Sequence, residues 1–375
     1  MLFVTGKAQL DEALAALKPA AWAGVDTEAD SLHHYLEKLC LVQVSVPGLD
    51  MVLDPLAVDL AEFHRVLVTK PLILQGADFD IRMLKRAYGA VPQAPVFDTM
   101  IAAQLLGYQE QGYAGLVRKH CAVELSKKPQ KADWSMRPLT EEMLEYASND
   151  TRFLKTLHDE MSEELRSLGR LDWHRQMCDR LLKQLAADDD GGRDEETAWQ
   201  VKGSKELKGR ALTLLRALWQ WRDSEARRMD RPSFKVLHTE EMVKLAKWSS
   251  ENPGRDVEEM PQAPRNIRGA LREGLNRVVK QSLEHAPAVY VNKKPKKPFK
   301  RWTDKSEKYF LELKAERERL GKELKKQPSL IETNVVLETI AEKPPRNASE
   351  IDAIEALLPF QRDLLKDFLL KAPQV

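Results

Sequence analysis

Short hydrophobic segments dominate the first part of the chain. Four of them have the length and composition of buried strands, at residues 22–27, 39–46, 51–53 and 72–74. From about residue 78 the hydrophobic positions recur at helical spacing, which predicts helices at 99–106, 113–121 and 141–165. Strands in quick succession, followed by a strand between helices, predict an α/β domain in which helices cover a mixed sheet.

The rest of the chain has helical periodicity with two breaks. One is an acidic, glycine-containing stretch at 188–192, and the other, at 292–301, holds six Lys or Arg and no acidic residue. Residues 330–337 loosely repeat residues 236–243 at an offset of 94, which indicates an internal duplication. The predicted organisation is an α/β domain at 1–165, a linker at 166–205, a helical domain at 206–286, a basic linker at 287–303 and a second helical domain at 304–375.

Composition narrows the class of protein. The 375 residues are 43% hydrophobic and 31% charged, as in globular proteins with substantial cores. No stretch approaches the roughly 18 apolar residues of a membrane span, and the first residues lack the pattern of a signal peptide. The cysteines, Cys40, Cys121 and Cys178, are too widely spaced to suggest a disulfide framework or a zinc site. We expect a cytoplasmic protein without a membrane partner.

Charge is distributed unevenly along the chain. The formal net charge of +1 combines −8 for residues 1–165 with +9 for residues 166–375. An acidic half joined to a basic half is typical of a catalytic or metal-binding unit attached to a unit that binds polyanions. Ordinary solvated surface charge would give the same totals, so these totals alone do not indicate a function. Particular residues have to be considered.

The first candidate residues are Asp26 and Glu28, at the end of the strand predicted at 22–27. Residues i and i+2 of a strand point to the same face, so the two carboxylates lie side by side. Paired carboxylates on an apolar strand repel each other, and a divalent cation would relieve this repulsion. Alternatively, both acids are simply solvated at the strand end.

Three aspartates follow strands later in the domain. Asp78 and Asp80 come after the strand at 72–74, and either could be a metal ligand or the N-cap of the next helix. Asp98 precedes Thr99 at the start of a predicted helix, and here the N-cap interpretation is preferred.

The last candidates are Tyr146 and Asp150, which are four residues apart on the helix predicted after Thr140. This spacing puts both side chains on one helix face, where a hydroxyl and a carboxylate can together hold a water or a metal ion. A packed tyrosine beside a surface aspartate is the alternative for an isolated pair.

In this order, the motifs resemble the DEDD superfamily of 3′–5′ exonucleases, in the subgroup whose third motif carries a tyrosine. Several short sequence segments are also similar to the ribonuclease D family and its relatives. They are Val25-Asp26-Thr27-Glu28, Leu41-Val42-Gln43-Val44, Asp133-Trp134, Arg137-Pro138-Leu139 and Glu145-Tyr146-Ala147-Ser148-Asn149-Asp150. The resemblance covers about residues 1–165 and implies an RNase H-like fold. Residues 218–237 are similar to the HRDC domain of this family, and 304–375 would be a second, degenerate copy.

The resemblance implies a two-metal 3′–5′ exoribonuclease that releases nucleoside 5′-monophosphates, with Mg²⁺ or Mn²⁺ as the cations. Asp26 would bridge the two ions, Glu28 and Asp150 would hold the ion that generates the hydroxide, and Asp80 would bind the other. Tyr146 would orient the attacking water. The family register favours Asp80 over Asp78 as the ligand.

Partners are implied in the same way. The resemblance suggests RNA, in particular tRNA precursors with 3′ extensions. Phosphates would meet a basic cluster in the first helical domain, formed by Arg265, Arg268, Arg272, Arg277 and Lys280, and the basic linker. Two alternatives stay open: a DNA exonuclease of the same superfamily, since these carboxylates do not distinguish ribose from deoxyribose, and a catalytically silent nucleic-acid-binding scaffold.

Overall fold

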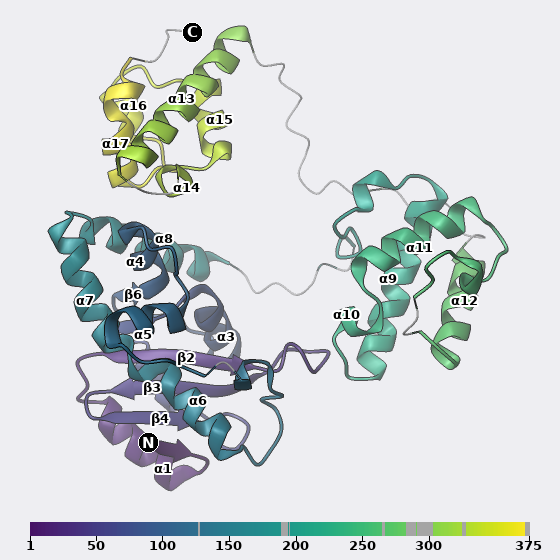
Figure 1. Cartoon of the computed structure of the whole chain (residues 1–375), viewed down its shortest axis with the longest axis horizontal. Coiled ribbons are helices and arrows are strands. Elements are labelled where there is room, and N and C mark those ends of the chain that lie inside the picture. Colours follow the sequence, from purple (N-terminus) through teal and green to yellow (C-terminus); the bar gives the residue numbers. More distant parts are fainter. Residues whose placement is uncertain are drawn as a thin grey trace. The chain divides into compact units, whose positions relative to one another are not determined.

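The computed structural model describes residues 1–126, 128–188, 194, 196–264, 267–282, 290, 303–324 and 328–371. The chain forms two compact units. One contains Met1–Glu28, Leu39–Asp189 and Lys300–Val375, and the other contains Ala29–Lys38 and Asp190–Phe299 (Figure 1). None of the described helices is long and apolar enough to cross a membrane.

A mixed sheet forms the centre of the first unit, as the hydrophobic pattern predicts. It has six strands, two more than the pattern shows. Its order is β1-β4-β3-β2-β5-β6, with β3 and β4 antiparallel and the pairs β1–β4, β2–β5 and β5–β6 parallel. The strands are β1 (Leu2–Val4), β2 (Ala23–Ala29), β3 (Leu39–Val46), β4 (Leu49–Leu53), β5 (Leu72–Leu74) and β6 (Val96–Asp98). The sequence pattern misses β1 and β6, each of which has three residues.

Helices cover this sheet, and α6 crosses β3 and β4 (Figure 1). They are α1 (Lys7–Leu17), α2 (Ala61–Leu67), α3 (Asp78–Tyr88), α4 (Thr99–Leu106), α5 (Tyr113–Cys121), α6 (Glu141–Arg152), α7 (Leu154–Ser167) and α8 (Leu171–Ala187), with a 3₁₀ turn η1 at Lys128–Lys131. The single helix predicted at 141–165 is wrong, because the chain breaks at Phe153 into α6 and α7.

The linker predicted at 166–205 also needs correction. Residues 171–187 of it form α8, which buries His174 and Cys178 against the α/β domain. The His174 ring lies 4.2 Å from the Phe97 ring of β6, between centroids, so this helix belongs to the core rather than to a tether. The acidic stretch at 189–192 lies outside the described residues.

The C-terminal helices of the first unit are α13 (Asp304–Glu323), α14 (Pro328–Ile331), α15 (Asn334–Glu342), α16 (Ala348–Asp352) and α17 (Pro359–Leu369). They enclose their own hydrophobic cluster around Leu313, Leu337 and Leu365. Their contact with α8 is specific: Phe360 stacks on Trp173, and the Phe360 N–H donates to the Gln176 side chain at 3.0 Å.

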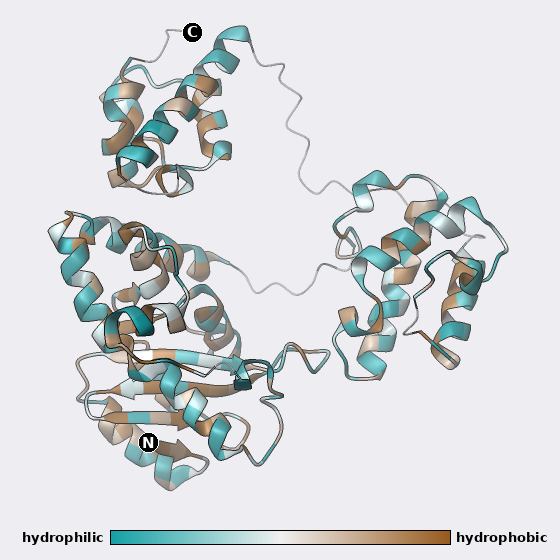
Figure 2. Cartoon of the chain, in the orientation of Figure 1, coloured by the Kyte–Doolittle hydropathy of each residue, from teal (hydrophilic) through white to brown (hydrophobic). Residues whose placement is uncertain are grey.

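The second unit is helical, with α9 (Arg210–Arg228), α10 (Ser233–Val236), α11 (Thr239–Glu251), α12 (Ala270–Ser282) and the 3₁₀ turns η2 (Ser204–Glu206) and η3 (Val257–Glu259). Hydrophobic and hydrophilic positions alternate along α9 and α11 (Figure 2). Trp199, Trp219 and Trp221 are buried in its core, so they serve packing and not base stacking. The loop after β2 joins this unit, since the Tyr35 hydroxyl donates to Asp223 at 2.8 Å.

Candidate active site

Three carboxylates from β2 and α6 converge at one point. Asp26, Glu28 and Asp150 each place a carboxylate oxygen within 4.8 Å of the others, as a cation site requires. The strand that carries the first two acids is anchored in the core, because its residues Ala23 and Val25 are fully buried. The fold thus brings Asp150 close to two acids that lie 122 positions or more before it in the sequence.

Asp80 joins the group from the first turn of α3. It is 4% exposed and accepts a hydrogen bond of 2.6 Å from the Thr27 hydroxyl, which lies between the two acids of β2. Its neighbour Asp78 is exposed and pairs with Arg82 one turn along the helix. The structure thus separates the two candidates of the second motif: Asp80 faces the other carboxylates and Asp78 faces solvent.

Asp98 has the capping role predicted for it, and more. Its carboxylate accepts from the backbone N–H of Met100 and Ile101 at the start of α4. The same carboxylate accepts from Gly76 and Ala77, each at 2.9 Å, in the turn that leads into α3. Asp98 therefore fixes the turn that orients Asp80, without facing the cluster itself.

Tyr146 lies one turn before Asp150 on α6, as predicted. Burial raises the pKa of its hydroxyl, and the charges of Asp150, Glu28 and Asp26 raise it further. The hydroxyl is therefore protonated at any ordinary pH and can donate a hydrogen bond. Its ring packs against the buried ring of Trp134, with centroids 5.9 Å apart.

The pKa values of the four carboxyl groups are all raised, so the ionised forms are unfavourable without a positive charge. Burial is the largest cause of each pKa shift, and neighbouring carboxylates add to it at Asp26, Glu28 and Asp150. The pKa of Glu28 rises to about 9 and that of Asp150 to about 7. The pKa of Asp80 rises to about 7, and that of Asp26 well above its usual value. Such uncompensated hard oxygen donors fit divalent cations such as Mg²⁺ or Mn²⁺.

These shifts predict how stability depends on pH when cations are removed. A carboxyl group whose pKa is higher in the folded state than in the unfolded state binds more protons when folded, so stability falls as pH rises. In EDTA, the melting temperature should fall progressively as pH rises from 5 to 9, and the contribution of each group should level off above its folded-state pKa, about 7 for Asp150 and about 9 for Glu28. Excess Mg²⁺ should reverse most of this loss, because it neutralises the ionised cluster.

Scanning calorimetry at both pH values, with EDTA and with Mg²⁺, measures this effect. Asp150→Asn removes one interacting charge and should reduce the difference between the two conditions. An EDTA-treated protein that is equally stable at pH 5 and pH 9 would contradict the electrostatic account.

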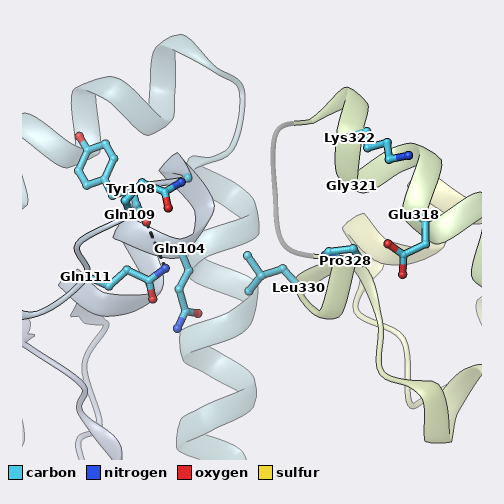
Figure 3. A pocket seen from close by; sticks show the side chains of 10 residues that line it. Gln104, Tyr108, Gln109, Gln111, Glu318, Gly321, Lys322, Pro328 and Leu330 are labelled. Carbon is cyan, nitrogen blue, oxygen red and sulfur yellow. Dashed lines mark hydrogen bonds between the residues drawn. The ribbon is translucent and has the colours of Figure 1, made fainter.

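An open pocket of about 510 Å³ adjoins the cluster. Tyr146 and Asp150 line one side of it, and Tyr113, Arg118 and Gln130 line others. Arg118 pairs with Glu110 and Glu124 at its rim. A second pocket of similar volume, lined by the turn after α4 and by α13 and α14, contains none of the predicted site residues (Figure 3).

The predicted basic cluster is only partly assembled. Arg268 and Arg277 have exposed side chains. Lys280 pairs with Asp256 at 2.9 Å, and Arg272 with Glu258 at 3.6 Å. Arg265 and the basic stretch 292–301 lie outside the described residues. Acidic partners from η3 therefore reduce the positive charge that sequence counting assigns to this helix.

Two side chains near the cluster are missed by local sequence rules. Thr27 belongs to the segment Val25-Asp26-Thr27-Glu28 that matches the family, and its hydrogen bond to Asp80 spans 53 residues. Tyr113, at the start of α5, donates through its hydroxyl to the Asn149 carbonyl at 2.8 Å, next to Asp150. No pattern in the sequence signals either contact, because both depend on how separate elements pack.

Comparisons with known proteins agree with this geometry. Residues 1–166 match a family model described as 3′-5′ exonuclease, and residues 211–255 match the HRDC domain. A ribonuclease D of Xanthomonas oryzae is 32% identical over 292 residues, which cover 76% of this chain and 79% of that protein.

Solved structures show the same arrangement of elements. The catalytic core of RRP6 from Trypanosoma brucei is 28% identical, with a TM-score of 0.61 over 75% of this chain and 79% of that one. Escherichia coli RNase D shares the fold, with 21% identity and a TM-score of 0.65 over 99% of both chains. The chain therefore belongs to the ribonuclease D family and is a 3′–5′ exoribonuclease.

Proposed function

We propose that the enzyme removes single nucleotides from RNA 3′ ends as 5′-monophosphates, with Asp26, Glu28, Asp80 and Asp150 as the ligands of two divalent cations. The observation that carries this proposal is the convergence of three partly buried carboxylates within 4.8 Å, with Asp80 hydrogen-bonded to the same strand. Mg²⁺ or Mn²⁺, when bound, supplies an activated water and neutralises charge on the leaving oxygen.

The protein's own groups have distinct tasks in this proposal. Asp26 and Glu28 from β2, with Asp150 from α6, would hold the cations beside the pocket that Asp150 lines. The Tyr146 hydroxyl, kept protonated, donates a hydrogen bond that orients the attacking water. Since Trp134 packs against its ring, the hydroxyl is held in place before substrate binds.

Precursors of tRNA with 3′ extensions are the proposed substrates. The test uses a labelled tRNA with a short 3′ tail, with Mg²⁺, with Mn²⁺ and with EDTA, beside a DNA strand of equal length. We expect a ladder of RNA fragments shortened from the 3′ end, mononucleotide products and no reaction in EDTA. Preferred degradation of DNA would support the DNA exonuclease, and binding without cleavage under all conditions would support the silent scaffold.

The C-terminal helices 304–371 are proposed to be a second HRDC-like domain. In α9, buried Arg222 donates to the Leu237 carbonyl and to Thr239, at 3.1 and 3.2 Å. In α13, buried Arg317 donates to the Glu332 carbonyl and to Asn334, at 3.0 and 2.8 Å. The three positions correspond at an offset of 95, one residue more than the sequence repeat suggests.

The shared arrangement supports a duplication on physical grounds. A buried guanidinium needs acceptors for its donors, and in both copies two acceptors at corresponding positions meet Nη1. In both, the guanidinium reaches the carbonyl that precedes a helix, α11 or α15, and a short helix of four residues, α10 or α14, comes just before it. Such a detail is harder to reproduce by chance than a loose hydrophobic match.

RNA binding by the second unit is proposed to rest on Arg268 and Arg277. Replacing both by alanine should weaken RNA binding and lower the slope of log affinity against log salt by about 0.7 per lost phosphate contact on a single strand. The turnover of a short, saturating oligonucleotide should not change, since neither residue lies in the carboxylate cluster.

Fluorescence anisotropy over a salt series measures this effect. The matched control is Lys7→Ala with Lys18→Ala, which removes two charges from α1 and its end. An equal change of slope in both variants would mean that overall charge, and not the particular positions of Arg268 and Arg277, governs RNA binding.

A further inference from the structure

The helix that carries the third motif is interrupted by a side chain from elsewhere. In a continuous helix, the Phe153 N–H would donate to the Asn149 carbonyl, four residues earlier. Instead, the Tyr113 hydroxyl lies between them. It donates to the Asn149 carbonyl at 2.8 Å and accepts from the Phe153 N–H at 3.3 Å.

This insertion accounts for the break between α6 and α7. Insertion of a side chain into the i→i−4 ladder is a recognised cause of helix kinks. Phe153, the residue at the break, has φ −96° and ψ −3°, which differ from the typical α-helical values of about −63° and −42°. Asp150 lies within this opened turn, directly after the residue whose carbonyl the tyrosine occupies.

The same turn is fixed to the sheet at two further points. The Thr151 hydroxyl shares a 2.7 Å hydrogen bond with Ser45 of β3. On β2, a Cβ at Gly24 would lie 3.3 Å from the Thr151 carbonyl oxygen, so glycine lets the helix approach the strand closely. Gly24 is two residues before Asp26 and shares its face of the strand. The opened turn thus rests against the strand that carries the partner carboxylates.

We propose that Tyr113 is a positioning residue for the cation site, whose inserted hydroxyl sets the backbone at Asp150 so that its carboxylate meets Asp26 and Glu28. The inference rests on the proposed function of those carboxylates. Without the hydroxyl, Asn149 and Phe153 can pair directly, which closes the turn and shifts Asp150. Tyr113 itself does not hold a cation, because its hydroxyl is already used by two backbone groups.

Tyr113→Phe tests this role, because it removes one oxygen and keeps the ring. The full-length variant should bind Mn²⁺ about tenfold more weakly in calorimetric titration, in the range seen for residues that orient metal ligands. Its kcat should fall at least tenfold at fixed Mn²⁺, while the KM for RNA stays within twofold. A crystal structure should show the Asn149 carbonyl accepting from the Phe153 N–H.

Tyr108→Phe is the matched control. Its hydroxyl donates to Glu164 at 2.6 Å, away from the carboxylate cluster, so this variant should keep the Mn²⁺ affinity of the wild type. Unchanged Mn²⁺ affinity in Tyr113→Phe, or an equal loss in Tyr108→Phe, overturns the inference. If the wild type itself neither binds Mn²⁺ nor degrades RNA, the proposed function fails instead, so the two failures are distinguishable.

Discussion

Replacing Asp150 by asparagine is expected to lower the turnover of RNA by about 10³-fold or more, while RNA binding persists. Asparagine keeps the shape of the side chain but removes the negative charge that completes the group of three oxygens within 4.8 Å. Asp26→Asn should have the same effect, since it removes the central carboxylate of that group. Single-turnover degradation of end-labelled RNA measures the rate, and anisotropy measures the binding.

The variants should not be less stable than the wild type in EDTA. The charge of Asp150 raises the pKa of Asp26 and of Glu28, so removing it relieves repulsion in the folded state. A loss of turnover therefore cannot be attributed to unfolding, and calorimetry checks this directly.

Asp78→Asn is the matched control within the second motif. Asp78 is two residues from Asp80 and carries the same charge, but it is exposed and pairs with Arg82. Its replacement should leave turnover within twofold of the wild type, whereas Asp80→Asn should abolish most of it. Near-normal turnover in Asp150→Asn, or a large loss in Asp78→Asn, would contradict the assignment of ligands.

Local periodicity is enough to predict the parts of the site that lie on one element. The i, i+2 spacing of Asp26 and Glu28 on a strand, and the i, i+4 spacing of Tyr146 and Asp150 on a helix, each determine a shared face. Their order along the chain, compared with a known family, predicts that the two elements meet. The mixed sheet was predictable for the same reason, because its longer strands are continuous hydrophobic runs.

Contacts between distant elements were not predictable from these patterns. The family register favours Asp80 over Asp78, but no local pattern reveals the hydrogen bond that Asp80 accepts from Thr27, 53 residues away. The helix predicted at 141–165 ends at Arg152 in the structure, where the Phe153 N–H donates to the hydroxyl of Tyr113 from another element. Likewise the linker predicted at 166–205 contains α8, whose packing partners include β6.

The pairing of Asp54 with Arg137 is a further example of a contact that no local rule reveals. Both Nε and Nη2 of the arginine donate to the Asp54 carboxylate, at 2.6 and 2.7 Å. The remaining donors reach backbone carbonyls of Cys40, Trp134 and Met136. The arginine thus fastens the segment that carries Trp134, whose ring supports Tyr146, to the end of β4.

Arg137→Met should therefore lower both stability and activity. The Asp54 side chain is 2% exposed, so removing its partner leaves a buried, unpaired carboxylate, a change that typically costs about 3–5 kcal/mol. Turnover should also fall in the protein that remains folded, because Trp134 loses its anchor and Tyr146 loses its support. Urea unfolding measures the first effect, and kcat at a temperature below the transition measures the second.

Two comparisons separate a specific role of Arg137 from a general loss of charge. Arg166→Met breaks an exposed pair with Glu163 and should change neither quantity, because exposed ion pairs contribute little. Combining Arg137→Met with Asp54→Leu removes both charges, and stability should recover, since the cost arises from the unpaired carboxylate rather than from the lost attraction. Turnover should stay low in that double variant, because neither new side chain can hold the carbonyls of Trp134 and Met136. If turnover recovered together with stability, the Trp134 segment would not need the hydrogen bonds from Arg137. In that case Arg137 would have no specific role in supporting Tyr146.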